Sequence, residues 1–533
     1  MRNLLLATAT LLGLSGAARA ATPPPPAPAF VDDGHGRMSL RVDGKPFLVL
    51  AGQPHNSSAW PDRMGAVWAA ADAMALNTLE APVYWQTLEP QPGRFDFTET
   101  DMLVHQARAH RKRLALLWFG TWKNGAMGYV PDWIKQDRQH YPRLRDADGN
   151  ETANGLSPFG AETLARDEAA FGALMRHLRA IDAAQHTVIL VQVENESGQF
   201  GTVRDHTEAA NAAFASPVPD AVLRAMRVDP KGGHPNWRDA FGARADECFA
   251  AWSVSRYVNA VAQAGHAADP LPLYANVWLR YRGLTQPGTD YPSGGGVWTV
   301  LPIWKAMTPA IGVLGTDVYT NSLAEFRKGV LPYDRPDNVP FVSESGITPA
   351  TARWVFDTLA RGGIGASQFG IDHQPGDPDL TPALVAHGRN NRLLGPMAAF
   401  LADAARQHRI SALIEDPGAP DPQTEIGDWR ITASFGAEWG KPSPTTAPLD
   451  ALAPGRALVV PIDATHLLIA GMSARIELQP KDDAAGPHEV LRVEEGHLTD
   501  SGWSTDRILN GDETDYGISL DPQGEAVRVT LGP

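Results

Sequence analysis

The chain has 533 residues, of which 43% are apolar and 20% charged, and its formal net charge is −15. This length exceeds what one hydrophobic core usually organises, so we expect two domains, one of them large. No block of lysines and arginines could hold a phosphate backbone, which argues against a nucleic-acid partner. The single cysteine, Cys248, excludes an intrachain disulfide and cysteine-based metal sites.

The first 20 residues are typical of a cleavable signal peptide. Arg2 precedes an apolar stretch over residues 4–14, and Ala18-Arg19-Ala20 forms a small-residue cleavage site before Ala21. The stretch is short for a membrane span and no later apolar run has spanning length, so no membrane span is expected. The proline-rich residues 21–37 are expected to be a linker. The sequence therefore predicts a periplasmic or secreted protein.

Residues 38–407 alternate short apolar runs with longer helical patterns. Eight such pairs indicate an α/β fold, the (β/α)8 TIM barrel. A doubly wound open sheet is the rival, but no G-x-G-x-x-G follows the first run to support a nucleotide site. The predicted strands are residues 47–52, 77–85, 113–122, 187–196, 271–279, 311–319, 339–346 and 363–372. Predicted helices include residues 61–74, 98–113, 160–184, 246–265 and 348–363.

Residues 408–533 change to strand-like pieces with frequent turns, which predicts a C-terminal all-β sandwich-like domain. No repeat of fixed period indicates a propeller or a solenoid. The pieces are residues 428–436, 455–471, 474–480, 488–496 and 525–532.

In a TIM barrel, reactive groups lie at the carboxyl ends of the strands. Polar and aromatic residues lie at the ends of all eight predicted strands, whereas the strand starts carry few such residues. These residues are His55 and Asn56, Trp85 and Glu89, Trp122 and Asn124, Asn195 and Glu196, Asn276 and Trp278, Asp317 and Tyr319, Glu344, and Asp372 and His373.

Two glutamates at strand ends suggest a reaction. Alternation along the fourth strand turns Gln192, Glu194 and Glu196 towards the barrel interior. We expect Glu194 to be a hydrogen-bonding acid inside the barrel and Glu196 to lie at its rim. Glu344 ends the seventh strand, across the barrel mouth. Hydrolysis of a glycosidic bond needs such a pair, one carboxyl neutral and the other ionised. Members of a structural ion pair are the alternative reading.

Three segments resemble glycoside hydrolase family 35, the β-galactosidases of a barrel clan with catalytic acids on strands 4 and 7. Residues 192–196, QVENE, resemble its Q-x-E-N-E signature, and residues 84–97, YWQTLEPQPGRFDF, are similar to its W-x-x-x-E-P-x-P-G-x-F-x-F segment. Residues 51–59, AGQPHNSSA, are similar to its first strand. The C-terminal part resembles a β-sandwich module of one bacterial subgroup.

The resemblance implies a retaining exo-β-galactosidase that removes terminal galactose from oligosaccharides such as xyloglucan-type plant fragments. It makes Glu196 the acid/base, Glu344 the nucleophile and Asn195 the partner of the sugar 2-hydroxyl. Tyr319 could orient the nucleophile, with rim packing as its alternative. Trp85, Trp122 and Trp278 are candidate walls for the sugar ring, with core packing as the alternative, and His55, Asn56 and Asn276 are candidate hydroxyl partners.

The chain departs from better-known members of that family. Pro82 replaces a tyrosine before Trp85, and Gly120-Thr121-Trp122 stands where they have Ala-Glu-Trp, so an acid that binds sugar hydroxyls is lost. Another retaining β-glycosidase, family 42-like, a β-glucosidase or a mannosidase, therefore stays open. A non-catalytic carbohydrate-binding protein is the alternative of another class. No metal or cofactor is expected, since H-E-x-x-H, a phosphate loop and clustered histidines are missing. The sequence indicates no oligomeric state.

Overall fold

The computed structural model describes residues 25–32, 38–230, 233–435, 437–438, 441–442, 454–481, 488–499 and 502–532. The predicted signal peptide lies outside these residues, as does much of the predicted linker. Within these ranges, no helix combines the length and the apolar character that crossing a membrane requires.

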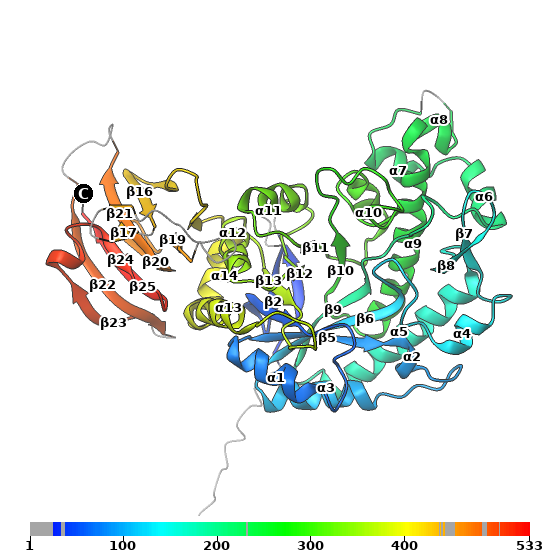
Figure 1. The fold of residues 1–533 in the computed structure, drawn as a ribbon, viewed down its shortest axis with the longest axis horizontal. Coiled ribbons are helices and arrows are strands. Elements are labelled where there is room, and N and C mark those ends of the chain that lie inside the picture. Colours follow the sequence, from blue (N-terminus) through cyan, green and yellow to red (C-terminus); the bar gives the residue numbers. More distant parts are fainter. Residues whose placement is uncertain are drawn as a thin grey trace, which may run out of the picture.

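Eight parallel strands form the barrel, which confirms the predicted fold (Figure 1). Seven neighbouring pairs share strand ladders, and the ring closes where Val342 pairs with Ala366 of the eighth strand. There the amide of Val342 donates to the carbonyl of Gly365 at 3.2 Å. In ring order the strands are β4 (Val49–Gln53), β5 (Thr78–Tyr84), β6 (Arg113–Lys123), β9 (Val188–Asn195), β10 (Leu273–Trp278), β11 (Val313–Val318), β12 (Glu344–Ser345) and β13 (Gly365–Phe369).

Helices follow the strands and cover the outside of the barrel. Every residue of β9 is buried, as expected of a strand with the barrel interior on one side and helices on the other. The principal helices are α1 (Met64–Ala73), α3 (Thr98–Ala109), α5 (Ala161–Asp182), α9 (Ala245–Ala268), α10 (Leu301–Met307), α11 (Leu323–Val330), α12 (Trp354–Ala360), α13 (Thr381–Leu394) and α14 (Ala398–Arg406). Short helices α2 (Trp85–Leu88) and α4 (Asp132–Gln136) and the hairpin of β7 (Arg143–Arg145) with β8 (Glu151–Leu156) lie in the loops.

A small three-stranded sheet precedes the barrel. It contains β1 (Ala29–Asp32), β2 (Met38–Val42) and β3 (Lys45–Pro46). Asp43 and Gly44 join β2 to β3 with φ angles of 54° and 77°. Positive φ at both central residues is what a two-residue type I′ hairpin requires, so the hairpin is a direct consequence of the Asp-Gly pair.

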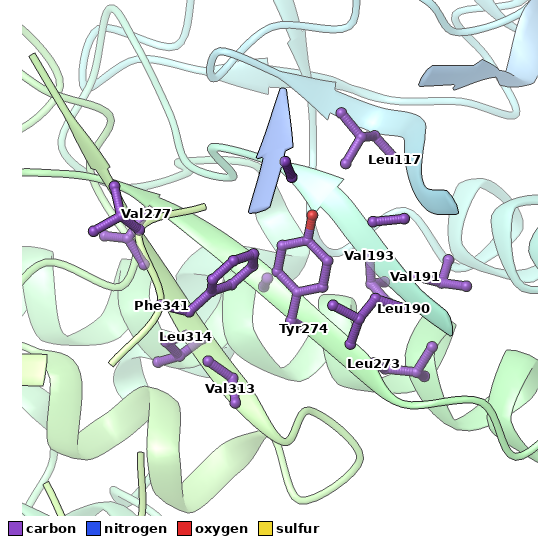
Figure 2. Packing of buried hydrophobic residues seen from close by; sticks show 14 of the residues in the cluster. Leu117, Leu190, Val191, Val193, Leu273, Tyr274, Val277, Val313, Leu314 and Phe341 are labelled. Carbon is purple, nitrogen blue, oxygen red and sulfur yellow. The ribbon is translucent and has the colours of Figure 1, made fainter. Parts of the chain in front are cut away.

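Side chains fill the barrel interior and give the site a packed floor. Figure 2 shows the rings of Tyr274 and Phe341 beside one another among aliphatic side chains. Their centroids are 5.4 Å apart in an edge-on arrangement, and the Tyr274 hydroxyl donates to Glu80 of β5 at 3.4 Å. A filled interior leaves the strand ends as the place where a ligand can enter.

Residues 199–237, directly after the fourth strand, lead into α6 (Glu208–Ala215), α7 (Asp220–Ala225) and α8 (Trp237–Phe241). Trp237 is buried against Phe249 and Trp252 of α9, with ring centroids 5.2 and 5.4 Å away. At this point the excursion packs on a barrel helix.

The C-terminal module contains two antiparallel sheets. Six strands pair in the order β14 (Ser411–Ile414), β19 (Arg456–Pro461), β20 (His466–Met472), β25 (Glu525–Leu531), β22 (Val490–Thr499) and β23 (Gly502–Leu509). Four pair in the order β15 (Gln423–Ile426), β16 (Trp429–Ser434), β21 (Ala474–Pro480) and β24 (Ile518–Leu520). Inward residues of both sheets form one apolar cluster, as in a β-sandwich.

The central strands β19 and β20 of the six-stranded sheet are buried on both faces. Ala457 and Val459 belong to the sandwich core, whereas the alternate residues Leu458 and Val460 join the apolar cluster of the barrel. Helix α12 packs against β14 and β19, and α13 packs against β20. Figure 1 accordingly shows the module beside the barrel with α12, α13 and α14 between them. Arg456, 2% exposed, donates from Nε to Asn390 of α13 at 2.8 Å.

Candidate active site

Three buried carboxyl groups meet at the carboxyl ends of the barrel strands. Glu196 directly follows β9, Asp317 lies in β11, and Glu344 begins β12. One oxygen of each lies within 4.8 Å of the other two, and the residues are 5%, 2% and 4% exposed. The two glutamates predicted to face each other are therefore neighbours, with an aspartate beside them. Among the described residues, these oxygens are also close enough together to hold a cation.

Tyr319 orients the Glu344 carboxylate. Its hydroxyl donates to Oε1 of Glu344, and its own backbone amide donates to the hydroxyl of Tyr281 at 2.8 Å. Burial of the phenol end and the nearby Glu344 charge raise the pKa of Tyr319, so the phenol stays a proton donor. Oε2 of Glu344 is buried without a hydrogen-bond partner among the described residues. That oxygen is free to react.

Asn276 holds the backbone of Glu196 in place. Glu196 has a φ of 43°, an uncommon conformation for a residue with a side chain. Its amide donates to Oδ1 of Asn276 at 2.8 Å, while Nδ2 of Asn276 donates to Asp317 at 2.6 Å. Both ends of the Asn276 amide are thus engaged by protein. The role of Asn276 as a sugar hydroxyl partner stays a prediction, while its place beside Glu196 gives it a positioning role.

The pKa of Glu196 is raised to about 7. Burial is the largest cause and the Glu344 charge the second, while Lys123 and a hydrogen bond with Asp317 oppose the shift. The pKa of Asp317 is also raised, by burial and by the Glu344 and Glu196 charges. Ser343 donates to the other Asp317 oxygen at 2.9 Å. A carboxyl with a pKa near 7 can be protonated and deprotonated within one catalytic cycle.

Lys123 fixes the amide of Asn195. Its Nζ donates to Oδ1 of Asn195 at 2.9 Å and lies 5.1 Å from the centre of the Phe119 ring. Lys123 is 7% exposed and has no carboxylate partner within ion-pair distance among the described residues. Asn195 Nδ2 is buried and unpartnered among the same residues. The lysine therefore aims a free N–H donor, which is what a sugar 2-hydroxyl would need.

Glu194 does not point where strand alternation predicts. Its φ of 62° breaks the extended backbone, and its carboxyl lies against Asp167 of helix α5. The backbone amide of Trp122 donates to Glu194 at 2.7 Å. Burial is the first cause and the Asp167 charge the second of a pKa raised well above the usual range. Glu194 is a hydrogen-bonding acid as predicted, but it faces the helix layer and not the barrel interior.

The Glu194 and Asp167 pair explains why residues 120–122 read Gly-Thr-Trp and not Ala-Glu-Trp. A Cβ on Gly120 would lie 2.8 Å from Glu194 Oε1, so glycine makes room for that carboxyl. Thr121, where the family has Glu, donates from its hydroxyl to Asp167 at 2.6 Å. Residues 120–122 are therefore used for internal packing.

Two of the three tryptophans predicted as sugar walls are core residues. Trp85 is fully buried and donates from Nε1 to Glu89 at 2.9 Å, and Trp122 is 2% exposed against the edge of the Tyr257 ring. Their flat faces are covered by protein, so core packing replaces the predicted role. Glu89 also accepts from the Gly93 amide at 2.7 Å, so its carboxylate stabilises the turn over residues 89–93.

The remaining predicted residues lie at the strand ends with free surface or free polar atoms. Trp278 is half-buried, 5.9 Å from the centre of the Phe200 ring. His55 contacts Asp372 through Nδ1 at 3.1 Å. Oδ1 of Asn56 is buried without a partner among the described residues. Their contacts with substrate stay predictions.

Sequence reasoning missed Asp317 and Lys123 as site residues. Asp317 was visible at the end of the sixth strand, but its partners depend on the register that sets it beside Glu344. Lys123 ends a strand whose register shifts between Trp118 and Lys123, which brings it beside Asn195. No local pattern signals that irregularity.

The fold and the paired carboxyls define the class: a TIM-barrel protein with a site of the kind that glycoside hydrolases use. Comparison with known proteins gives the relationship. The chain is 30% identical over 221 residues to a β-galactosidase of Xanthomonas manihotis, covering 40% of this chain and 33% of that protein. It is 27% identical over 178 residues to human β-galactosidase, covering 31% of this chain and 23% of that protein. The resemblance to β-galactosidases is thus confirmed, although the chain spans only about a third of the first relative.

The other comparisons concern the module and the fold. Residues 387–521 match a family described as a domain of unknown function, DUF5597. The solved β-galactosidase of Rahnella sp. R3 aligns with a TM-score of 0.47 at 16% identity, covering 68% of this chain and 58% of that one.

Proposed function

We propose that the protein is a retaining exo-β-galactosidase, with Glu196 as acid/base and Glu344 as nucleophile. The observation that carries this proposal is the approach of the two carboxyls, whose oxygens lie within 4.8 Å of each other. Retaining glycosidases place these groups about 5–5.5 Å apart, whereas inverting ones leave about 6.5–9.5 Å for a water molecule. Direct attack by the carboxylate is the chemistry that this spacing favours.

In the first step, Oε2 of Glu344 attacks the anomeric carbon. The bond from that carbon to the glycosidic oxygen breaks, its electron pair goes to the oxygen, and Glu196 supplies the proton. Tyr319 holds Oε1 of Glu344, so the attacking oxygen is the unpartnered one. The pKa of about 7 keeps a useful fraction of Glu196 protonated at neutral pH.

In the second step, a water molecule attacks the same carbon while Glu196, now ionised, accepts its proton. The bond to Glu344 breaks and galactose leaves with its original configuration. Charge on Glu344 is lost when the covalent intermediate forms. Its repulsion of Glu196 disappears with it, so the pKa of Glu196 falls and its role changes from acid to base.

Galactose as the sugar is supported by the relatives, which are named β-galactosidases. The exo mode, oligosaccharides of xyloglucan type as substrates and export from the cytoplasm extend the same proposal. The first 20 residues support export, and amino-terminal sequencing of the mature protein should begin at Ala21.

A panel of nitrophenyl β-glycosides tests the sugar. We expect the galactoside to be hydrolysed with the highest kcat/KM, and a higher value for the glucoside or mannoside would replace galactose. Proton NMR of the first product should show the β anomer. Chelation with EDTA should leave the rate unchanged, because no step uses a metal.

Two variants test the residues. Glu344→Gln should lower kcat for every leaving group by at least ~10⁴-fold, because no attacking carboxylate remains. Glu196→Gln should lower it strongly for an alkyl leaving group but little for the first step with dinitrophenolate, which needs no proton. Glu477→Gln, an exposed change in β21, is the matched control. Full activity of either site variant would sink the proposal.

A further inference from the structure

A cavity of about 340 Å³ lies between the loop that follows β10 and helix α11. Its walls are the loop over residues 279–285, Trp298, Pro332 and one face of α11. The volume is in the lower part of the ~300–1,000 Å³ range of small-ligand sites. Tyr281 connects this cavity with the candidate active site: it lines the cavity, and its hydroxyl accepts from the amide of Tyr319, the residue that holds Glu344.

The cavity has the aromatic surface that a sugar ring uses. Trp298 is 51% exposed, whereas Trp85 and Trp122 are covered. Arg280 lies over the Trp298 ring at 5.7 Å and over the Tyr291 ring at 5.3 Å. Its Nε also donates to the carbonyl of Leu284 at 2.9 Å, so the guanidinium is fixed before any ligand arrives.

The charges of the lining leave a positive excess. Lys328 and Glu325 form an ion pair with each other at 2.8 Å, and Asp290 near Arg280 accepts from two backbone amides of the loop. Arg282 is exposed and, within the described part of the chain, has neither an ion-pair nor a hydrogen-bond partner. The chain as a whole has a net charge of −15, whereas Arg280 and Arg282 make the charge of this cavity locally positive.

We infer that this cavity binds a carboxylate-bearing sugar, a uronic acid unit, in the leaving-group part of the substrate. The ring would pack on Trp298 while its carboxylate pairs with Arg282, whose planar fork matches a carboxylate. We assign the cavity to the leaving-group side because its loop follows β10, the neighbour of the strand that leads into the proton donor Glu196. This placement rests on the proposed function, whereas the binding itself does not.

Binding of two simple glycosides by the whole protein decides the inference. Methyl β-glucuronide and methyl β-glucoside differ only at C6, which is a carboxylate in the first and a hydroxymethyl group in the second, and calorimetry measures the binding of each. We expect the glucuronide to bind on the order of 10-fold tighter, with the preference lost in about 1 M NaCl. Arg282→Gln should remove the preference, and its exposed, unpartnered side chain makes misfolding no concern. Arg176→Gln, an exposed arginine of α5, is the matched control.

Equal affinities for the two glycosides, or an unchanged preference in Arg282→Gln, would overturn the inference. Turnover then tests the placement. A β-galactoside of glucuronate should be cleaved with a kcat/KM on the order of 10-fold above that of a β-galactoside of glucose, and Arg282→Gln should equalise them. Equal kcat/KM values for the two galactosides in the wild type would show that the uronate does not bind on the leaving-group side. Failure to cleave nitrophenyl β-galactoside would instead contradict the proposed function and leave the binding result standing.

Discussion

Tyr319 donates its phenolic hydrogen to one oxygen of Glu344, and the other oxygen of that carboxylate has no hydrogen-bond partner in the described part of the chain. The bond does two things at once. In the proposed mechanism it fixes which oxygen attacks, and it stabilises the negative charge that the nucleophile needs before the reaction.

Tyr319→Phe should lower kcat/KM by about 10²-fold, the usual effect of losing one preorganised donor at a reacting group. The nucleophile is then less well oriented and more basic. Steady-state kinetics with nitrophenyl β-galactoside measure the effect. Tyr516→Phe, at an exposed tyrosine of the C-terminal module, should leave the rate unchanged. Wild-type activity in Tyr319→Phe would assign Tyr319 to rim packing.

Lys123→Met should move the alkaline limb of the kcat/KM profile upward by about one pH unit. Lys123 lowers the pKa of Glu196, which is about 7 in the wild type. Without the ammonium, Glu196 keeps its proton to higher pH, and the protonated form is the active acid. Profiles of kcat/KM between pH 5 and 9 measure the shift, with Lys123→Met expected to lose rate as well, because Asn195 loses its anchor.

Lys45→Met in the exposed strand β3 removes the same charge far from the site and should leave the limb unmoved. An unmoved limb in Lys123→Met would show that the lysine does not tune the acid.

The buried Glu194 and Asp167 pair should make the protein less stable as pH rises. Both pKa values are raised in the folded protein, so the folded state binds more protons than the unfolded chain. The stability that this contributes is fully present below the unfolded pKa of about 4.5 and is lost as pH rises through the folded value. Thermal unfolding at pH 5 and pH 8 should show a lower Tm at pH 8.

Glu194→Gln removes one titrating group, so the Tm of this variant should fall less between pH 5 and pH 8 than the Tm of the wild type. Glu477→Gln in the exposed part of β21 should keep the wild-type difference. Equal pH differences in Glu194→Gln and the wild type would show that the pair does not titrate on unfolding.

Gly120→Ala should lower the free energy of unfolding by about 1–3 kcal/mol, since its Cβ would crowd Glu194 and the neighbouring ring of Trp118. Gly65→Ala is the matched control, because a Cβ there meets nothing within 4 Å and the residue lies in α1. Alanine favours a helix over glycine, so Gly65→Ala should gain up to about 1 kcal/mol. Urea unfolding measures both. Equal stability of the two variants would contradict this account of Gly120.

The barrel could be predicted because each strand is an apolar run between helical patterns, and apolar periodicity depends only on neighbours in sequence. The same holds for the Asp43-Gly44 hairpin. The proximity of Glu196 and Glu344 could be predicted because the carboxyl end of a barrel strand is a place that sequence alone defines.

Residues whose roles depend on register or on backbone irregularity could not be predicted. Strand alternation aims Glu194 inward, but its positive φ turns it to helix α5. Lys123 reaches Asn195 through an irregular register. Asn276 follows a strand like a hydroxyl partner, yet both ends of its amide are bound by neighbours that only the folded barrel supplies.

Strands β19 and β20 of the six-stranded sheet lie between the barrel helices and the second sheet of the module, and both of their faces are covered. The module is consequently not an independent domain on a flexible linker that could be removed without affecting the barrel. Ending the chain before Ser411 would strip α12 and α13 of their apolar cover and leave Asn390 without the guanidinium of Arg456. The barrel and the module share one packed core. Substitutions in the module can therefore change the temperature at which the barrel unfolds and the arrangement of Glu196 and Glu344 is lost.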